Sequence, residues 1–430
     1  MRLPLVTLVA LLSLALPSAA SAAALPALIE TIHKDLWTRF VQPNGLLLDY
    51  TTPSGNIELP TASECLEGKP NALAWWTPVE NGTFFTGIYL DAAVRRWQLT
   101  GAAADRANAG KLARGLLLAA SVSDVPGFVA RNVSADGKSH YAIGSDDQTA
   151  PWFQGLWAYV RSGAATPEEK TKIEAKMVAL ATTLRGLKWY LPCDSSGGLP
   201  PGQIRGTLAA PDFRSACRQL FITRIIYEIT RDSSWLHAYE NALTAPTRTG
   251  KTMLDYVEAG LPGLFAQSHG MDRQLWISVN PQAMLRALVD LESRPAIREK
   301  YLAALRLNAV TVAPRIVAAP TADVSLAPMD TDWRALNAHW HAQATVDDAV
   351  ALALSELGDW KNHGRNLENS TIREPLCAAA IALLAPGADA DLKISGKLSP
   401  FIARVPWTSL RGSFGFFAEY AWLLGNPPRH

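Results

Sequence analysis

The sequence predicts an all-α fold, because apolar residues recur with helical spacing and no strand pattern is clear. In residues 168–187, the apolar side chains Ile173, Met177, Leu180 and Leu184 follow the spacing of one buried helix face. Similar stripes recur along the chain, and no run of alternating polar and apolar residues predicts a strand. With 430 residues, of which 48% are hydrophobic, the chain can bury a large core.

Apolar stripes of this kind predict twelve helices in total. We expect them at Leu25–Phe40, Gly82–Leu99, Ala103–Ala120, Thr149–Arg161, Glu168–Leu187, Phe213–Arg231, Ser233–Thr244, Pro281–Glu292, Arg294–Leu305, Thr345–Gly358, Ile372–Leu384 and Gly412–Leu424.

Long and short connections alternate between these helices. The long segments are Val41–Asn81, Ser121–Gln148, Lys188–Asp212, Ala245–Asn280, Arg306–Ala344 and Ala385–Arg411. Antiparallel neighbours place every long segment at the same end, and connections longer than about 15 residues are usually functional. We therefore expect one domain, residues 23–430, with an active site at that end.

Residues 1–22 have the pattern of a cleaved secretion signal. Arg2 precedes an apolar run at residues 3–16, and residues 20–22 are the small residues of a cleavage site. The apolar run is shorter than the roughly 20 residues needed to span a bilayer. The sequence therefore predicts a secreted or periplasmic protein, and no other segment is expected to cross a membrane.

The chain has four cysteines, none of them in a metal-binding spacing. Outside the cytoplasm Cys65, Cys193, Cys217 and Cys377 can pair in three ways. We expect Cys193 to pair with Cys217, because both flank one connection, with buried free thiols as the alternative.

Charge and motifs exclude several classes of function. The chain has 40 Lys and Arg against 39 Asp and Glu, and removal of the leader with Arg2 lowers the formal charge from +1 to zero. No nucleic-acid partner is therefore expected. The sequence also lacks GxSxG, GxGxxG, GxxxxGK[ST] and HExxH, which disfavours serine hydrolases, dinucleotide enzymes, P-loop enzymes and zincins.

The densest cluster of polar and aromatic residues surrounds Asp146 and Asp147, which we take as candidate catalytic residues. They stand where a helix is expected to begin, so Ser145 and Gln148 would form a capping box around them. A carboxylate at a helix N-terminus is favoured in its ionised form. This position suits a base or an electrostatic stabiliser better than a proton donor.

Glu80 is the candidate proton donor. It precedes Asn81, the expected N-cap of the next helix, and lies in aromatic surroundings that would raise its pKa. Glycosidic bond cleavage commonly uses one protonated and one ionised carboxyl group. We therefore pair Glu80 with Asp146 or Asp147; the alternative is that Glu80 is a solvated loop acid.

Aromatic, basic and amide side chains in the long connections are candidate substrate contacts. Tryptophan faces suit sugar rings and guanidinium groups match carboxylates, although many large aromatics only fill the core. Trp75 and Trp76 cannot both face one way in an extended segment, so one should line the cleft. The candidates are Trp75, Trp76, Asn81, Arg131, His140, Tyr141, Gln148, Trp152, Arg205, Trp333, His339 and His341.

No metal or other cofactor is expected. A His339-x-His341 step in extended backbone can chelate a metal, but no third ligand is identifiable in the sequence. Two histidines this close are more often substrate contacts or ordinary loop residues.

The helix pattern, the leader and the segments Glu80-Asn81-Gly82 and Asp146-Asp147-Gln148 resemble those of six-hairpin glycosidases with an (α/α)6 toroid. Unsaturated glucuronyl and rhamnogalacturonyl hydrolases are the most similar. The resemblance implies that an aspartate protonates the enol-ether double bond of a Δ4,5-uronyl sugar, and this role would fall on Asp146 or Asp147. It implies a glycoside hydrolase that acts on uronic-acid-containing oligosaccharides or polysaccharides. We expect the protein to be a monomer.

Two other functions remain open at this point. A polysaccharide lyase on a similar toroid would use Asn81, Arg131, His140 and Tyr141 to neutralise a uronate and remove its C5 proton. A non-catalytic glycan-binding protein would keep the cleft and its tryptophans, and its carboxylates would only cap helices.

Overall fold

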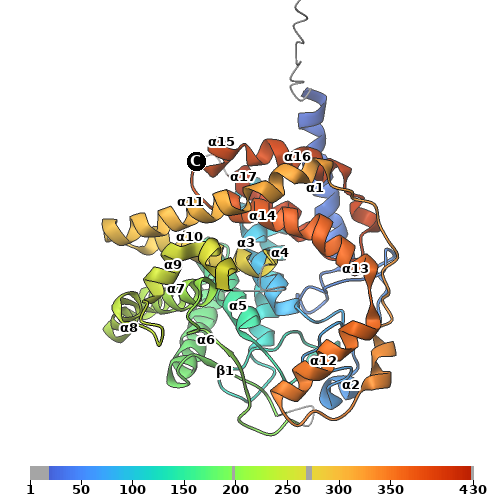
Figure 1. Ribbon diagram of the computed structural model, residues 1–430, viewed down its shortest axis with the longest axis horizontal. Coiled ribbons are helices and arrows are strands. Elements are labelled where there is room, and N and C mark those ends of the chain that lie inside the picture. Colours follow the sequence, from blue (N-terminus) through green and yellow to red (C-terminus); the bar gives the residue numbers. More distant parts are fainter. Residues whose placement is uncertain (1–18, 196–198, 268–273, 428–430) are drawn as a thin grey trace, which may run out of the picture.

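The computed structural model describes residues 19–195, 199–267 and 274–427, and these ranges are predominantly helical (Figure 1). The expected all-α class is confirmed. The helices are α1 (Ala19–Arg39), α2 (Ala62–Glu67), α3 (Gly82–Thr100), α4 (Ala103–Ala119), α5 (Asp146–Arg161), α6 (Pro167–Gly186), α7 (Phe213–Thr230), α8 (Ser233–Thr244), α9 (Met253–Gln267), α10 (Trp276–Leu291), α11 (Pro295–Ala318), α12 (Val346–Trp360), α13 (His363–Glu368), α14 (Glu374–Leu383), α15 (Ala388–Leu392), α16 (Ile394–Arg404) and α17 (Gly415–Gly425).

A two-stranded sheet, three 3₁₀ turns and a π-helical turn lie between the α-helices in the described ranges. Strands β1 (Tyr190–Pro192) and β2 (Ile204–Thr207) form one antiparallel pair, with Tyr190 opposite Thr207. Three-residue and seven-residue 3₁₀ turns lie at Ala319–Thr321, Trp333–His339 and Trp407–Ser409, and a π-helical turn at Asn369–Arg373 leads into α14.

Local sequence explains where a typical helix begins and which face it buries. In α6 the Thr166 side chain accepts a hydrogen bond from the backbone of Glu169, whose carboxylate accepts one from the backbone of Thr166 in return. Pro167 occupies the first helical position, where a missing N–H costs nothing. The expected face with Ile173 and Leu184 is buried, so the spacing argument is confirmed for this helix.

Six helices, which we call the central helices, pack against one another in a closed sequence of contacts. α3 packs on α5, α5 on α7, α7 on α10, α10 on α14, α14 on α17, and α17 again on α3. The other helices pack outside them: α4 on α3, α6 and α8 on α7, and α11 on α10 and α14. Figure 1 shows α7 to α11 on one side of the molecule and α2, α12 and α13 on the other.

Two glycines allow α3 and α5 to approach closely. A β carbon at Gly87 would collide with the backbone of Pro151, and one at Gly155 would collide with the backbone of Gly87. Glycine is required there by the space between the helices. This close packing brings the beginning of α3 beside the beginning of α5.

All twelve expected helices are present, but the long connections were wrongly expected to lack regular structure. The segment 245–280 contains α9, and the segment 385–411 contains α15 and α16. α9 is interrupted by Gly260, which has a φ of 56°, and by Pro262. These residues break the apolar spacing that identifies a helix in the sequence.

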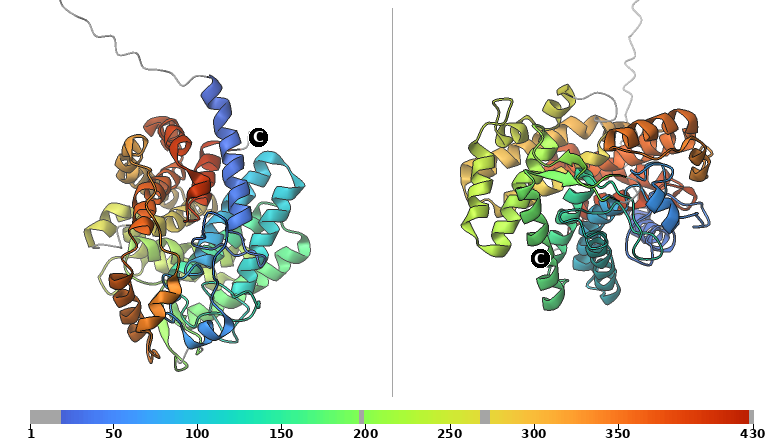
Figure 2. Two further views of the ribbon diagram at one scale, coloured as in Figure 1. Left: turned by 90° about the vertical axis from the view of Figure 1, so that its right-hand side faces the viewer. Right: turned by 90° about the horizontal axis from the view of Figure 1, so that it is seen from below.

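Only the end of the expected leader falls within the residues that the structure describes. Residues 1–18 lie outside the described residues, whereas the expected cleavage site at residues 20–22 lies in the first turns of α1, the end of the helix that extends beyond the rest of the molecule (Figure 2). Among the described residues one helix, Pro295–Thr321, is long and apolar enough to cross a membrane, contrary to expectation. Residues such as Tyr301 and Leu305 bury one side of this helix in the core.

The expected disulfide is wrong, because all four cysteines are free and buried. Cys217 lies on α7 in the main core. Cys193 lies in a separate small cluster with Ala142 and Leu199 beneath the connecting segments. The two thiols flank one connection in sequence but belong to different cores.

Candidate active site

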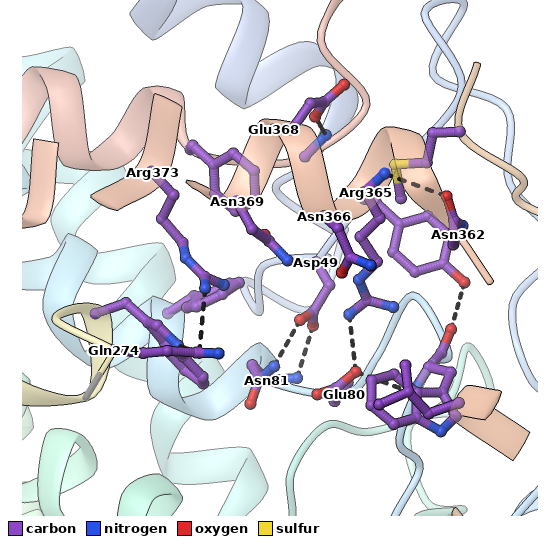
Figure 3. A pocket seen from close by; sticks show the side chains of 18 of the residues that line it. Asp49, Glu80, Asn81, Gln274, Asn362, Arg365, Asn366, Glu368, Asn369 and Arg373 are labelled. Atoms are coloured by element: carbon purple, nitrogen blue, oxygen red, sulfur yellow. Dashed lines mark hydrogen bonds and ion pairs between the residues drawn. The ribbon is translucent and has the colours of Figure 1, made fainter. Parts of the chain in front are cut away.

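A cavity of about 300 Å³ opens where several central helices begin (Figure 3). Glu80 and Asn81 come from the approach to α3, Trp276 from the start of α10, and Phe414 from the residue before α17. Further residues that line it belong to α13 and the π-helical turn. A second cavity is lined by the later parts of the same helices, so these helices run in the same direction.

Polar contacts connect this cavity with the beginnings of α5 and α7. Gln148 Nε2 in α5 donates to Asn81 Oδ1 at 3.2 Å. Asp146 accepts a hydrogen bond from Nη1 of Arg218 in α7. Arg214, in the first turn of α7, donates to the carbonyl oxygen of Gln274 at 3.3 Å. Gln274 lines the cavity, and we call this whole end of the central helices the mouth.

Two carboxyl groups, those of Asp49 and Glu80, line the cavity close enough for their charges to interact. Asp49 accepts hydrogen bonds from the backbone N of Asn81 at 2.6 Å and from its Nδ2 at 2.7 Å. Burial, reinforced by the nearby charge of Glu80, raises the pKa of Asp49 to about 7. Glu80 Oε2 accepts from Arg365 Nη2 and from the backbone N of Trp76, both at 2.9 Å.

Aromatic rings surround the Arg365 guanidinium. Its carbon lies 5.2 Å from the ring centre of Tyr50, 5.5 Å from that of Trp360 and 5.7 Å from that of Trp76. Such rings attract a cation and exclude water from it. The charge of Arg365 is therefore directed toward Glu80 and the open cavity.

A second arginine, Arg373, lies across the cavity from Arg365 (Figure 3). Its guanidinium carbon lies 4.8 Å from the ring centre of Trp276 and 5.6 Å from that of Phe414. Its Nη2 donates to Gln274 Oε1 at 3.3 Å. Burial lowers the pKa of Arg373, although the neighbouring Glu374 opposes this effect.

Asp146 and Asp147 are adjacent in sequence, but their surroundings shift their pKa values in opposite directions. Burial raises the pKa of Asp146, and the Arg218 charge only partly offsets it. Burial also opposes ionisation of Asp147, but the charge of Arg131 and the hydrogen bond from Ser145 outweigh it and lower its pKa. The expectation that a helix N-terminus favours the ionised form therefore agrees with Asp147 and is wrong for Asp146.

The expected capping roles are wrong for Ser145, Gln148 and Asn81, because tertiary partners take their polar atoms. Neither Ser145 nor Asn81 makes a side-chain capping bond. The Ser145 hydroxyl donates to Asp147, and Gln148 Oε1 accepts from the backbone N of Phe84 at 2.9 Å. Gln148 thus joins α5 to α3 instead of closing its own helix.

Arg131 connects the segment that carries Glu80 with the segment that carries Asp146 and Asp147. It is buried, its Nη1 donates to the Glu80 carbonyl oxygen at 3.1 Å, and its Nη2 donates to Ser145 Oγ at 3.2 Å. Arg205, on β2, contributes a positive charge near Asp146 and Asp147. These two expected contacts lie at the mouth, although neither lines the cavity.

The expected tryptophans divide into two groups. Trp76 lines the cavity, whereas Trp75 lies 5.3 Å from the guanidinium of Arg205, so one of the adjacent pair does line it. Their segment is a turn, in which Trp76 has a φ of 70°, and was wrongly expected to be extended. Trp152 and Trp333 are fully buried and donate to backbone carbonyl oxygens, which makes them core residues.

The remaining expected contacts lie outside the cavity lining. Tyr141 is buried and donates to the carbonyl oxygen of Lys69, and burial raises its pKa well above the ordinary value. His140 Nε2 lies 2.9 Å from Asp194, and the exposed His341 lies 3.2 Å from Asp348.

His339 is the last residue of the 3₁₀ turn Trp333–His339, so the segment expected to be extended is helical up to this residue. Within the described ranges, no group of three or more His, Cys, Asp or Glu side chains is placed to hold a metal ion.

Sequence reasoning missed Asp49, Arg365, Glu368 and Arg373. Glu368 accepts from the backbone N of Gly412 at 2.8 Å, and burial raises its pKa. One signal was available: polar residues recur through 362–373 with helical spacing, although we expected a simple connection before the helix at Ile372–Leu384.

Comparison of the chain with protein-family models, with curated proteins and with solved structures finds no match.

Proposed function

We propose that this chain is a secreted or periplasmic glycoside hydrolase that acts on oligosaccharides containing uronic acid, including unsaturated uronyl residues. The observation that carries the proposal is the pair Asp146 and Asp147, whose pKa values are moved apart at a mouth rich in arginine. Two carboxyl groups with opposite shifts are what acid and base roles require.

We further propose that the fold is an (α/α)6 toroid. The closed sequence of contacts among the six central helices supports this, as does the packing of α4, α6, α8 and α11 outside them. The mouth would then be one end of the toroid. Helix N-termini directed at that end favour an anionic substrate.

In the proposed reaction Asp146 is the proton donor. Its side chain is 31% exposed, so a substrate can reach it. Asp49 also has a raised pKa, but it is only 5% exposed and both its oxygens already accept from Asn81. Access therefore favours Asp146, and Asp49 and Glu80 belong to the wall that binds the sugar.

Asp147 remains ionised and stabilises the positive charge that develops on the sugar ring. For an unsaturated uronyl sugar, Asp146 gives its proton to C4 of the double bond. Water then adds at C5, and loss of its proton restores a neutral product that opens and releases the next sugar. In this proposal Asp147 accepts the proton from that water.

Ultraviolet absorbance of the C4=C5 uronyl double bond tests the proposal directly. Purified protein is mixed with lyase-cut acidic oligosaccharides and, separately, with the intact polysaccharides. Loss of absorbance on the cut oligosaccharides supports the hydrolase. A gain of absorbance on intact polymer would indicate a lyase and contradict the proposal. No change on either would leave an ordinary glycosidase or a glycan-binding protein, and would contradict the proposed action on unsaturated uronyl residues.

A further inference from the structure

Two asparagine side chains in the wall of the cavity are open to a ligand. Asn366 on α13 and Asn369 in the π-helical turn both line the cavity, and Figure 3 shows their amides directed into it. Asn366 is exposed and Asn369 is half-buried, so a ligand can reach both from solvent. In the part of the chain that the structure describes, neither side chain has a hydrogen-bond partner.

The chemistry of these free groups suits hydroxyl groups better than an anion. An asparagine amide has an oxygen that accepts hydrogen bonds and an NH2 group that donates them. A sugar hydroxyl also does both, whereas a carboxylate or a sulfate only accepts. Glu80 offers a further acceptor, because its Oε2 is bonded to Arg365 and to the backbone of Trp76, whereas its Oε1 accepts no hydrogen bond within the described ranges.

Aromatic rings supply the apolar part of the lining. Trp276 and Phe414 lie beside one arginine of the cavity, and Trp76 and Trp360 lie beside the other. Trp360 is half-buried, so part of its ring remains open. A pyranose ring combines an apolar face of C–H groups with hydroxyl groups at its edge, and it can pack on such rings. The cavity volume of about 300 Å³ suits a ligand of this small size.

The charges around the cavity do not favour an acidic sugar there. Arg365 is paired with Glu80 at 2.9 Å, and Arg373 lies 3.6 Å from Glu374. Glu368 also lines the cavity, so carboxyl groups outnumber the two guanidinium groups. A carboxylate placed here would meet Glu80 Oε1, and both guanidinium groups already have an acidic neighbour. A cationic sugar would in turn lie beside the two guanidinium groups.

We propose that the cavity holds an uncharged sugar ring, so that the sugar linked to the uronyl unit is a neutral pyranose. This inference rests on the proposed function, which supplies the uronyl unit, and specifies the neighbouring part of its substrate. The hydrogen bond between Gln148 and Asn81 joins the start of α5, where Asp146 lies, to the cavity wall. The acidic sugar lies beside Asp146, and the neutral sugar occupies the adjoining cavity.

Isothermal titration calorimetry on the wild-type protein tests this with saturated disaccharides, which lack the double bond and are not consumed by the proposed reaction. One pair is β-1,4-linked glucuronosyl-glucose and glucuronosyl-glucuronate. The other is α-1,4-linked galacturonosyl-galactose and digalacturonate. The members of each pair differ only at C6 of the second sugar. We expect the ligand with the neutral second sugar to bind about tenfold or more tightly in at least one pair.

Equal or weaker binding of the neutral-sugar ligand in both pairs would overturn the inference, as would no binding of any of the four ligands. The absorbance assay separates this result from the proposed function. Turnover without the preference overturns only the inference, whereas the preference without turnover overturns only the proposed hydrolase.

Variants locate the neutral sugar in the cavity. Asn366→Ala and Asn369→Ala should each weaken binding of the preferred ligand about fivefold, because each removes hydrogen bonds to a hydroxyl group. Asn241→Ala is the matched control, since Asn241 is exposed on α8 and lies outside the lining of this cavity, and its affinity should not change. Glu80→Gln should narrow the preference, because it removes a charge that repels the second carboxylate. Wild-type affinities in all three cavity variants would overturn the inference.

Discussion

Gly206 leaves space for the carboxylate of Asp146. A β carbon at Gly206 would lie 2.8 Å from Asp146 Oδ1, and Gly206 has a φ of +78°. Both the space and the backbone angle favour glycine. Strand β2 therefore fixes the position of the proposed proton donor from outside its own helix.

Gly206→Ala should reduce turnover because the new methyl group displaces Asp146. Gly202→Ala is the matched control, since Gly202 has a φ of +84° with nothing within 4 Å of its β carbon position. Both variants should lose about 1–2 kcal/mol of stability from the left-handed backbone. Thermal unfolding and the absorbance assay measure the two effects, and equal turnover in the two variants would show that the contact has no catalytic consequence.

Asp146→Asn should lower kcat by about 10²–10⁴-fold, because the amide cannot donate the proton of a carboxylic acid. Binding of the substrate should persist. Asp347→Asn is a control at an equivalent helix position, because Asp347 also lies in the first turn of a helix but is exposed on α12. Full activity of Asp146→Asn would remove Asp146 from the mechanism.

The raised pKa of Asp49 predicts a pH dependence of stability. Between about pH 4 and 7 the folded protein keeps a proton on Asp49 that the unfolded chain has released, so this group contributes less stability as pH rises. The free energy of unfolding of wild type minus that of Asp49→Asn should fall by at least about 1.4 kcal/mol across this range. Denaturant titrations at pH 4, 5.5, 7 and 8 measure it. A difference that does not change with pH would show that Asp49 titrates normally.

Tyr141→Phe should keep most of the wild-type turnover. The Tyr141 hydroxyl is buried against the Lys69 carbonyl oxygen, so its loss should cost stability but no catalytic group. A lowered melting temperature with near-normal kcat is the expected result. An inactive, folded Tyr141→Phe protein would instead favour elimination chemistry.

Four free thiols should be found in the unfolded protein without reductant, because Cys65, Cys193, Cys217 and Cys377 are unpaired. Alkylation in denaturant followed by mass spectrometry counts them. Only two modified cysteines would restore a disulfide. The melting temperature should also be insensitive to reducing agent.

The sequence was informative about helices because each one buries a continuous face. The stripe from Ile173 to Leu184 needs no distant partner to be recognised. α9 was missed because Gly260 and Pro262 interrupt its stripe. Periodicity therefore predicts straight core helices well and broken ones poorly.

The site was predictable only where a residue's role depends on nearby sequence. Glu80 was assigned to the cleft from its position before a helix, and one of the adjacent Trp75 and Trp76 was expected to line it; Glu80 and Trp76 do line the cavity. Asp49 was missed because its raised pKa depends on Glu80 and on burial by distant segments. Gln148 was assigned to its own helix, whereas its partners are Phe84 on α3 and Asn81 just before it. Such partners are a property of tertiary packing.

The shared direction of the central helices has a consequence for how this protein can diversify. Each central helix brings its own preceding segment to the mouth, so one segment can be exchanged while the others stay in place. The segment that carries Arg205 and Gly206 could be replaced without altering the wall that carries Arg365. An insertion within a central helix would instead turn its following side chains by about 100° per residue. New specificities should therefore arise from changes in the connecting segments, with the helix lengths kept constant.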